Sequence, residues 1–174
     1  MRQLGVDLKE HAPTILRLWQ EVLTEPPLRL PAGHDPGELP VIIQDLIEVS
    51  ILRPHDVQAH EAKISAAVRH GESRRKAGAS ETLIFEEFAA LREAIRRYLE
   101  LCDVPKWKRR EALMRLDMAI SVTEQGAIRG YYRDAFEKVK LWDNMINQLA
   151  RTSPLLGLPE PGDAPGGDAF IPRR

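Results

Sequence analysis

Residues 70–92 of the chain read HGESRRKAGASETLIFEEFAALR. Gly78 interrupts the helical pattern, and glycine readily takes the left-handed conformation found just past a helix end. Ser80 follows as a residue typical of a helix N-cap, and Glu81 places a negative charge in the first turn, where the helix dipole favours it. The stretch therefore predicts two helices joined by a short turn, as in a helical hairpin.

Both helices of this hairpin extend beyond the quoted residues. We expect the first from Asp56, a candidate N-cap, to about Lys76, and the second from Ser80 to about Cys102. Apolar residues recur at intervals of three and four along both, which is the period of one helix face. The predicted inward residues are Val57, His60, Ile64, Ala67, Val68 and Gly71 on the first helix, and Leu83, Ile84, Phe88, Leu91, Ile95 and Leu99 on the second.

Prolines delimit two shorter helices nearer the N-terminus. Pro13 suits the first turn of a helix that ends near Thr24, and Pro40 begins a helix that continues through Leu52. An earlier helical turn is expected from Asp7, a residue type typical of an N-cap. No segment of the sequence shows the strict alternation of a half-buried strand, so we predict an all-α fold.

The longest helical pattern covers residues 106–151. At 1.5 Å per residue a continuous helix of this length would span roughly 70 Å, far more than the helices beside it. It therefore either projects from the bundle or bends near Gly126 and Gly130, since glycine weakens a helix. Residues 153–174 are rich in proline and glycine and predict a disordered tail. The prediction is a domain over residues 1–152, a bundle of about five helices with a long C-terminal helix.

The second half of this long helix carries a heptad pattern. Its apolar residues are spaced alternately by four and three positions, as in the seam of a coiled coil. These residues are Ile128, Tyr132, Ala135, Val139, Trp142, Ile146 and Leu149. Two interpretations stay open: the stripe packs inside its own bundle after a bend, or it forms a homodimer with the same stripe of a second copy.

Charge and cysteine content exclude several classes of protein. The 174 residues include 25 Lys and Arg against 26 Asp and Glu, so the chain lacks the basic excess that drives nucleic-acid binding. The single Cys102 cannot form an internal disulfide, which excludes a disulfide-stapled secreted scaffold. No run of about 18 apolar residues and no leader-like apolar region occurs, so we expect a cytoplasmic protein that does not cross a membrane.

The sequence lacks the common catalytic and metal-binding motifs. His60-Glu61 is followed by Ile64 where a zinc protease has its second histidine, and Cys102 has no neighbouring cysteine. The basic run at residues 106–110 is most simply a solvated face. We therefore expect neither an enzyme nor a resident metal or cofactor.

The hairpin places a small set of polar residues where they can meet. If its helices are antiparallel about Gly78, His70 stands opposite Glu87 and both can point inward. Arg92, little more than one turn beyond Glu87, is a candidate second partner for the carboxylate, and Arg74 lies one turn beyond His70. This network either fastens the hairpin or senses a proton or a ligand, because imidazole is the side chain that changes charge near neutral pH.

The spacing of these residues resembles a known family. The N-terminal domain of RsbRD-type proteins, which precedes the RsbT co-antagonist output module, has a similar arrangement, and similar domains precede bacterial histidine kinases. The resemblance covers about residues 10–150, and residues 116–120, LDMAI, resemble a later segment of those domains. The residues that carry it are His70, Arg74, Gly78, Ser80, Glu87, Phe88, Leu91 and Arg92.

The resemblance implies an all-helical, cytoplasmic sensory or regulatory domain of bacterial signal transduction, as in the stress response, without catalytic activity. A globin-like bundle without an assured haem is one form of such a domain. Because only the tail follows Arg151, we expect a partner protein, such as a kinase or an anti-sigma-type regulator, to supply the output. The alternative is a small-molecule or haem-binding helical carrier or sensor, with His60 or His70 as an axial ligand.

Overall fold

The computed structural model describes residues 2–28, 30 and 34–152, so the predicted tail lies outside the described residues. The described residues form seven α-helices and one π-helical turn and contain no strand, which confirms the predicted all-α helical bundle. None of these helices combines the length and the apolar character needed to cross a bilayer. The elements are α1 (Arg2–Glu10), α2 (Ala12–Thr24), α3 (Leu39–Ile47), η1 (Glu48–Leu52), α4 (Val57–Lys76), α5 (Glu81–Leu101), α6 (Lys106–Tyr131) and α7 (Arg133–Thr152).

Several helix starts follow the sequence signals. Pro13 lies in the first turn of α2 and Pro40 in the first turn of α3. The carboxylate of Asp56 accepts a hydrogen bond from the backbone N–H of Ala59 at 3.1 Å and so caps α4. Ser80 precedes α5 as predicted, although its side chain makes no capping hydrogen bond. Local side-chain chemistry therefore accounts for where these helices begin.

The N-terminal segment differs from the prediction in two places. α1 begins at Arg2, and Asp7 lies inside it, where its carboxylate accepts a hydrogen bond from Nε2 of Gln3 at 2.9 Å. The helix expected from Pro40 through Leu52 is α3 followed by the π-helical turn η1. The start expected at Asp7 was therefore wrong, since α1 already ends at Glu10, whereas residues 40–52 are helical as predicted.

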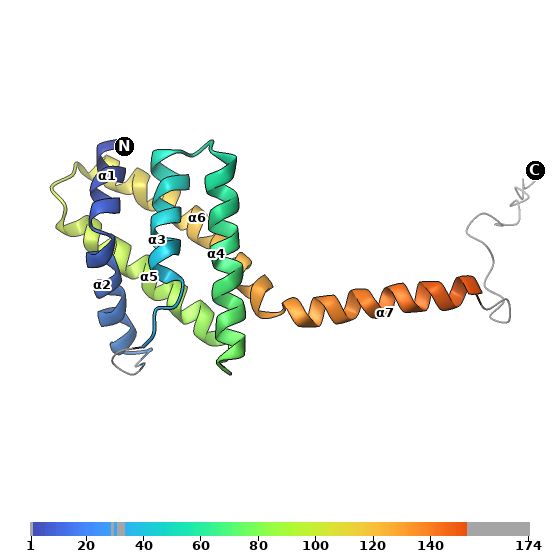
Figure 1. Ribbon diagram of the computed structural model, residues 1–174. Helices are drawn as coiled ribbons and strands as arrows, with labels where there is room; N and C mark the ends of the chain where they lie inside the picture. The colour runs from blue at the N-terminus through green and yellow to red at the C-terminus, as the bar shows by residue number, and fades with distance from the viewer. Residues whose placement is uncertain (1, 29, 31–33, 153–174) are drawn as a thin grey trace, which may run out of the picture. The chain divides into compact units, whose positions relative to one another are not determined.

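The first compact unit, Met1–Asp134, is built around one apolar core. In Figure 1, α2, α3 and α4 lie next to one another, and α5 and α6 cross them. Trp19 of α2, Leu46 of α3 and Phe88 of α5 are completely buried in this core. Full burial of a large apolar side chain contributes about 1.5–3 kcal/mol, so these contacts are the main force that holds the helices together.

α4 buries only part of the face predicted for it. Val57 and Ile64, which the apolar pattern places inward, are 69% and 42% exposed. Ala67 and Gly71 are buried as predicted, together with His70, which the hairpin geometry also places inward. Large apolar residues therefore do not mark the inner face of α4, because this helix buries mainly small and polar groups.

Small residues on α4 let the backbone of α6 approach very closely. A Cβ atom on Gly71 would lie 1.8 Å from the carbonyl oxygen of Ala127, and one on Gly130 would lie 2.1 Å from the carbonyl oxygen of Val68. Both distances are far shorter than a real contact allows. The two glycines are therefore needed for the packing of α4 on α6.

The long C-terminal helix is interrupted. α6 ends at Tyr131, the backbone leaves the helix at Tyr132 with φ −98° and ψ 8°, and α7 begins at Arg133. The break lies just beyond Gly130, close to where it was expected, but Gly126 and Gly130 are themselves inside α6. The second compact unit begins within α7, at Ala135.

We expect Gly71→Ala to lower the free energy of unfolding by roughly 2 kcal/mol or more, because overpacking costs about 1–3 kcal/mol and here the added methyl group meets rigid backbone. Gly126→Ala is the matched control, since its methyl group lies 3.2 Å from the Cβ of Ala67 and at an ordinary 3.9 Å from the carbonyl oxygen of Ile64. Urea unfolding followed by circular dichroism measures both variants. Equal stabilities of the two variants would contradict the close contact.

Candidate functional site

A fully buried carboxylate, that of Glu87 on α5, lies at the centre of the candidate site. Its Oε2 lies 2.8 Å from Nε2 of His70, and its Oε1 lies 2.8 Å from Nε2 of His34. Arg74 donates from Nε to Oε2 at 3.1 Å and from Nη2 to Oε1. These four residues are called the Glu87 cluster. The carboxylate thus accepts hydrogen bonds from three different side chains.

Three segments position the Glu87 cluster. α4 carries His70 and Arg74 one turn apart on its buried face. Gly78, with φ +74°, ends the helix and turns the chain so that Glu87 on α5 faces both residues. His34 comes from the segment that precedes α3. The cluster therefore ties this segment to the hairpin of α4 and α5.

Two backbone carbonyl oxygens accept further hydrogen bonds at the cluster. Nη2 of Arg74 also donates to the carbonyl oxygen of Asp35 at 2.6 Å, beside His34. The indole Nε1 of the buried Trp19 donates to the backbone carbonyl oxygen of Glu87 at 2.9 Å. Through Trp19, α2 is joined to the same point of α5.

The geometry determines which ring nitrogens carry hydrogen. An ionised carboxylate only accepts hydrogen bonds, so Nε2 of His34 and Nε2 of His70 must both be donors. Nδ1 of His70 is buried and has no hydrogen-bond partner among the described residues. A Cβ atom on Gly37 would lie 3.5 Å from this nitrogen, so the segment before α3 covers it. The site therefore has one unused hydrogen-bonding position.

The charges of the Glu87 cluster compensate one another. Burial on its own would raise the pKa of Glu87, but hydrogen bonds and charges from His70 and Arg74 outweigh burial and hold the pKa below its usual value of 4.5. The carboxylate is therefore ionised at neutral pH and balanced by the buried Arg74. This arrangement suits a structural or sensing role, because a carboxylate whose oxygens are both engaged is poorly placed to exchange protons with a substrate.

Three members of the predicted network lie together, and the fourth does not. His70, Arg74 and Glu87 meet, whereas Arg92, expected as a partner of Glu87, pairs instead with Asp117 of α6 at 2.9 Å. Arg92 also reaches Glu124 of α6 at 2.7 Å. That part of the prediction was wrong because five residues along a helix rotate a side chain by about 140° away from its starting face.

His34 was not among the predicted site residues. It lies between the helix that ends near Thr24 and the one that begins at Pro40, and no periodicity connects it to the hairpin. The available signal was indirect: a buried carboxylate needs several donors, and a histidine in an adjoining loop can supply one. His34 is 18% exposed, so it is the member of the Glu87 cluster nearest to solvent.

The predicted heptad seam is divided between the two compact units. Ile128 and Tyr132 are half-buried and pack against the core of the first unit. Val139 and Trp142, on α7, are 57% and 61% exposed. The side chains of Ile146 and Leu149 lie outside the described residues.

The histidines considered as haem ligands are engaged in other contacts. Nε2 of His60 lies 3.0 Å from the carbonyl oxygen of Pro54, and Nε2 of His70 faces Glu87. Among the described residues, no group of three or more His, Cys, Asp or Glu side chains is arranged to hold a metal ion.

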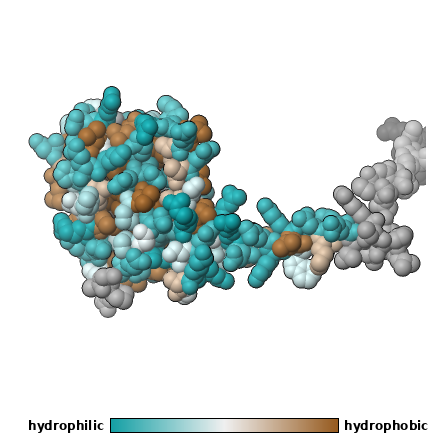
Figure 2. All heavy atoms as spheres, in the orientation of Figure 1, coloured by the Kyte–Doolittle hydropathy of each residue, from teal (hydrophilic) through white to brown (hydrophobic). Residues whose placement is uncertain are grey.

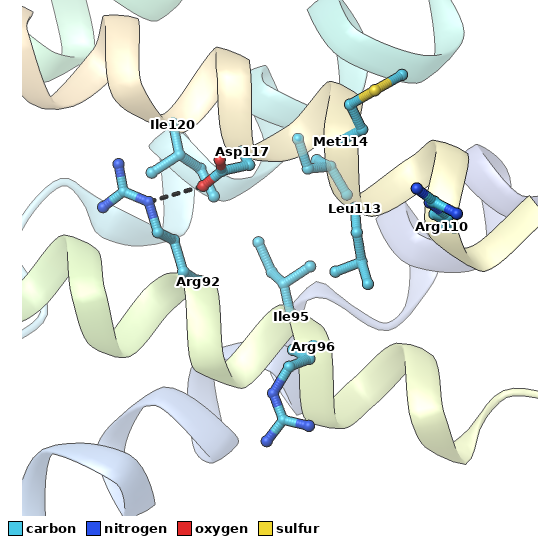
Figure 3. A pocket seen from close by; sticks show the side chains of 9 residues that line it. Arg92, Ile95, Arg96, Arg110, Leu113, Met114, Asp117 and Ile120 are labelled. Carbon is cyan, nitrogen blue, oxygen red and sulfur yellow. Dashed lines mark hydrogen bonds and ion pairs between the residues drawn. The ribbon is translucent and has the colours of Figure 1, made fainter.

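A cleft of about 400 Å³ lies between α5 and α6. In Figure 3, Ile95 of α5 and Leu113 of α6 point into the space between the two helices, and the ion pair of Arg92 with Asp117 lies beside it. Its lining is largely apolar, so the cleft offers apolar contact to a bound group.

No family model, curated protein or solved structure matches the chain. The resemblance to RsbRD-type domains therefore stays a prediction, carried by the residues of the hairpin.

We expect Glu87→Gln to lower the free energy of unfolding by about 3–5 kcal/mol, because it leaves the buried Arg74 without a counter-charge. Glu93→Gln is the matched control on the same helix: Glu93 pairs with Arg96 and Arg97 at the surface, where an ion pair contributes about 0–1 kcal/mol. Urea unfolding at pH 7 measures the free energy of unfolding of both variants and of the native chain. A loss below about 1 kcal/mol in Glu87→Gln would contradict the account of the cluster.

The lowered pKa of Glu87 also predicts a dependence on pH. Because its folded-state pKa lies below 4.5, the stabilisation is complete above about pH 4.5 and is lost as the pH falls through the folded-state value. The stability difference between the native chain and Glu87→Gln should therefore be constant above about pH 4.5 and shrink as the pH falls below it, measured by urea unfolding. A difference that does not change on acidification below pH 4.5 argues against an ionised Glu87.

Proposed function

We propose that this chain is a non-catalytic regulatory module of bacterial signal transduction that works in the cytoplasm through contacts between helices. The observation that carries the proposal is the exposure of large apolar side chains along α7. Phe136, Val139, Leu141, Trp142 and Met145 are each about half exposed or more. Figure 2 shows hydrophobic residues among hydrophilic ones on this helix. Exposed apolar groups of this size are typical of a surface that binds another protein.

The heptad positions on α7 favour a second copy of the chain as the partner. In the predicted seam, Val139 and Ile146 fall at the a positions, and Ala135, Trp142 and Leu149 fall at the d positions. In parallel coiled coils, β-branched residues at a with leucine at d favour two strands, and Val139, Ile146 and Leu149 fit this pattern.

Charges beside the seam support the same arrangement. Lys138 and Asp143 fall at the g position and the following e position of α7. In a parallel coiled coil these two positions face each other across the interface, so each Lys138 would meet the Asp143 of the second copy. The two-fold axis of a homodimer repeats this pair on the other side of the interface, so both contacts join a lysine with an aspartate.

The Glu87 cluster is the proposed sensing element of the module. It holds His34, which is partly exposed, to buried groups of α4 and α5. A proton or ligand that favours one arrangement of this contact over another would shift the packing of the hairpin. The likeness of the hairpin to RsbRD-type domains supports this role. It also supports a kinase or an anti-sigma-type regulator as the partner that carries the signal onward.

We expect Trp142→Glu to abolish the homodimer, because a charge in the centre of the seam cannot be buried without a partner. Asn144→Glu, on the opposite side of α7, is the matched control and should leave the dimer intact. Sedimentation equilibrium of the full chain measures both masses. The proposal fails if Trp142→Glu and the native chain have the same mass.

A further inference from the structure

The cleft between α5 and α6 has the size and the lining of a small-molecule site. Its volume of about 400 Å³ falls within the range of roughly 300–1,000 Å³ that is typical of ligand pockets. Apolar side chains from both helices form most of its wall: Ile95 of α5, and Leu113, Met114, Leu116 and Ile120 of α6. Ligand pockets of this kind usually add a few polar groups that orient the bound molecule. Here the cationic groups in the lining are guanidiniums.

Two of the three arginines that line the cleft already have carboxylate partners. Arg92 pairs with two acids of α6, and Arg96 pairs with two acids of its own helix. Because each of these guanidiniums is matched by two carboxylates, neither offers a free positive charge to a ligand. The carboxylates are Asp117 and Glu124 for Arg92, and Glu93 and Glu100 for Arg96.

The third arginine, Arg110, is different. It lines the cleft, is exposed, and forms no hydrogen bond or ion pair with any residue in the described part of the chain. Figure 3 shows it at the opposite end of the cleft from Arg92. Between Arg110 and Ile120, α6 rises by about 15 Å. The cleft therefore has an uncompensated positive charge at one end and an elongated apolar wall beside it.

We propose that this cleft binds an apolar monocarboxylate, a small molecule with an elongated apolar body and one carboxylate. The carboxylate accepts hydrogen bonds from the guanidinium of Arg110, whose planar fork matches its two oxygens. The apolar body lies against Ile95 and Leu113, which point into the space between the two helices, and so leaves water.

The charges at the other end of the cleft determine which acids fit. There Asp117 and Glu124 outnumber Arg92, so a second carboxylate on the ligand would meet like charge. The site therefore selects monocarboxylates over dicarboxylates of the same length. The proposal does not depend on dimerisation through α7, because both helices of the cleft belong to the first compact unit.

The first test compares ligands. Decanoate, kept below the concentration at which it forms micelles, should bind the full chain saturably in isothermal titration calorimetry. Decanol has the same chain length but no charge for Arg110, and decanedioate adds a second carboxylate. Both should bind about tenfold more weakly or worse, because a hydrogen bond to a charged group contributes about 1.5–3 kcal/mol and about 1.4 kcal/mol is a factor of ten.

The second test compares two variants of the same basic run. Arg110→Gln should raise the dissociation constant for decanoate about tenfold or more, since it removes the guanidinium that holds the carboxylate. Lys108→Gln is the matched control: it removes an equal charge two residues away, but the Lys108 amine lies over the ring of Trp107 and does not line the cleft. Its dissociation constant should stay within about twofold of that of the native chain. Circular dichroism confirms that both variants are folded.

The third test locates the ligand. In methyl NMR of isoleucine-labelled full chain, decanoate should shift the signal of Ile95, which lines the cleft. Ile64 of α4 is the control, because it is 42% exposed and would respond if decanoate adsorbed to any apolar surface.

Each outcome decides the proposal. Saturable binding that is weakened in Arg110→Gln but not in Lys108→Gln, with a shift at Ile95 and none at Ile64, supports the site. A native chain that does not bind decanoate saturably overturns it. Equal affinities of the two variants, or binding of decanol as tight as that of decanoate, also overturn it. Equal shifts at Ile95 and Ile64 show adsorption to the surface and contradict a site in the cleft.

Discussion

The fold depends on the compensation of one buried charge, the carboxylate of Glu87. Such a group is tolerated inside a protein only when its charge and its hydrogen-bonding capacity are satisfied. Here the donors come from α4 and from the segment before α3, so these parts of the chain must be in place for α5 to pack. Because His34 contacts the buried carboxylate directly, a displacement of His34 would remove one of the donors that Glu87 requires.

α6 packs directly against the backbone of α4. Gly71 of α4 and Gly130 of α6 lie at this contact, with no intervening side chains that could absorb a shift. A movement of α4 relative to α5 would therefore displace α6 as well, because closely packed elements transmit strain. Trp107, Met114 and Met118 of α6 are exposed.

Sequence patterns predicted the features that depend on local chemistry. The turn at Gly78, the cap at Asp56, and the meeting of His70 with Glu87 all follow from short-range spacing. The inner face of α4 was predicted only in part: Val57 and Ile64 were wrongly placed inward, because the buried residues of this helix are mainly small or polar and give a weak apolar period. His34 was missed because its role depends on a loop folding over α4 and α5, which no periodicity encodes. Gly130 was interpreted as a weak point of a helix, although it serves a close crossing.

We propose that this chain works through contact between the helices of two copies. The solution mass of the unmodified full chain at micromolar concentration, by sedimentation equilibrium, tests that claim most directly. We predict a species of about twice the 19.7 kDa chain mass that dissociates on dilution. A single species at the chain mass over the whole concentration range would contradict the account.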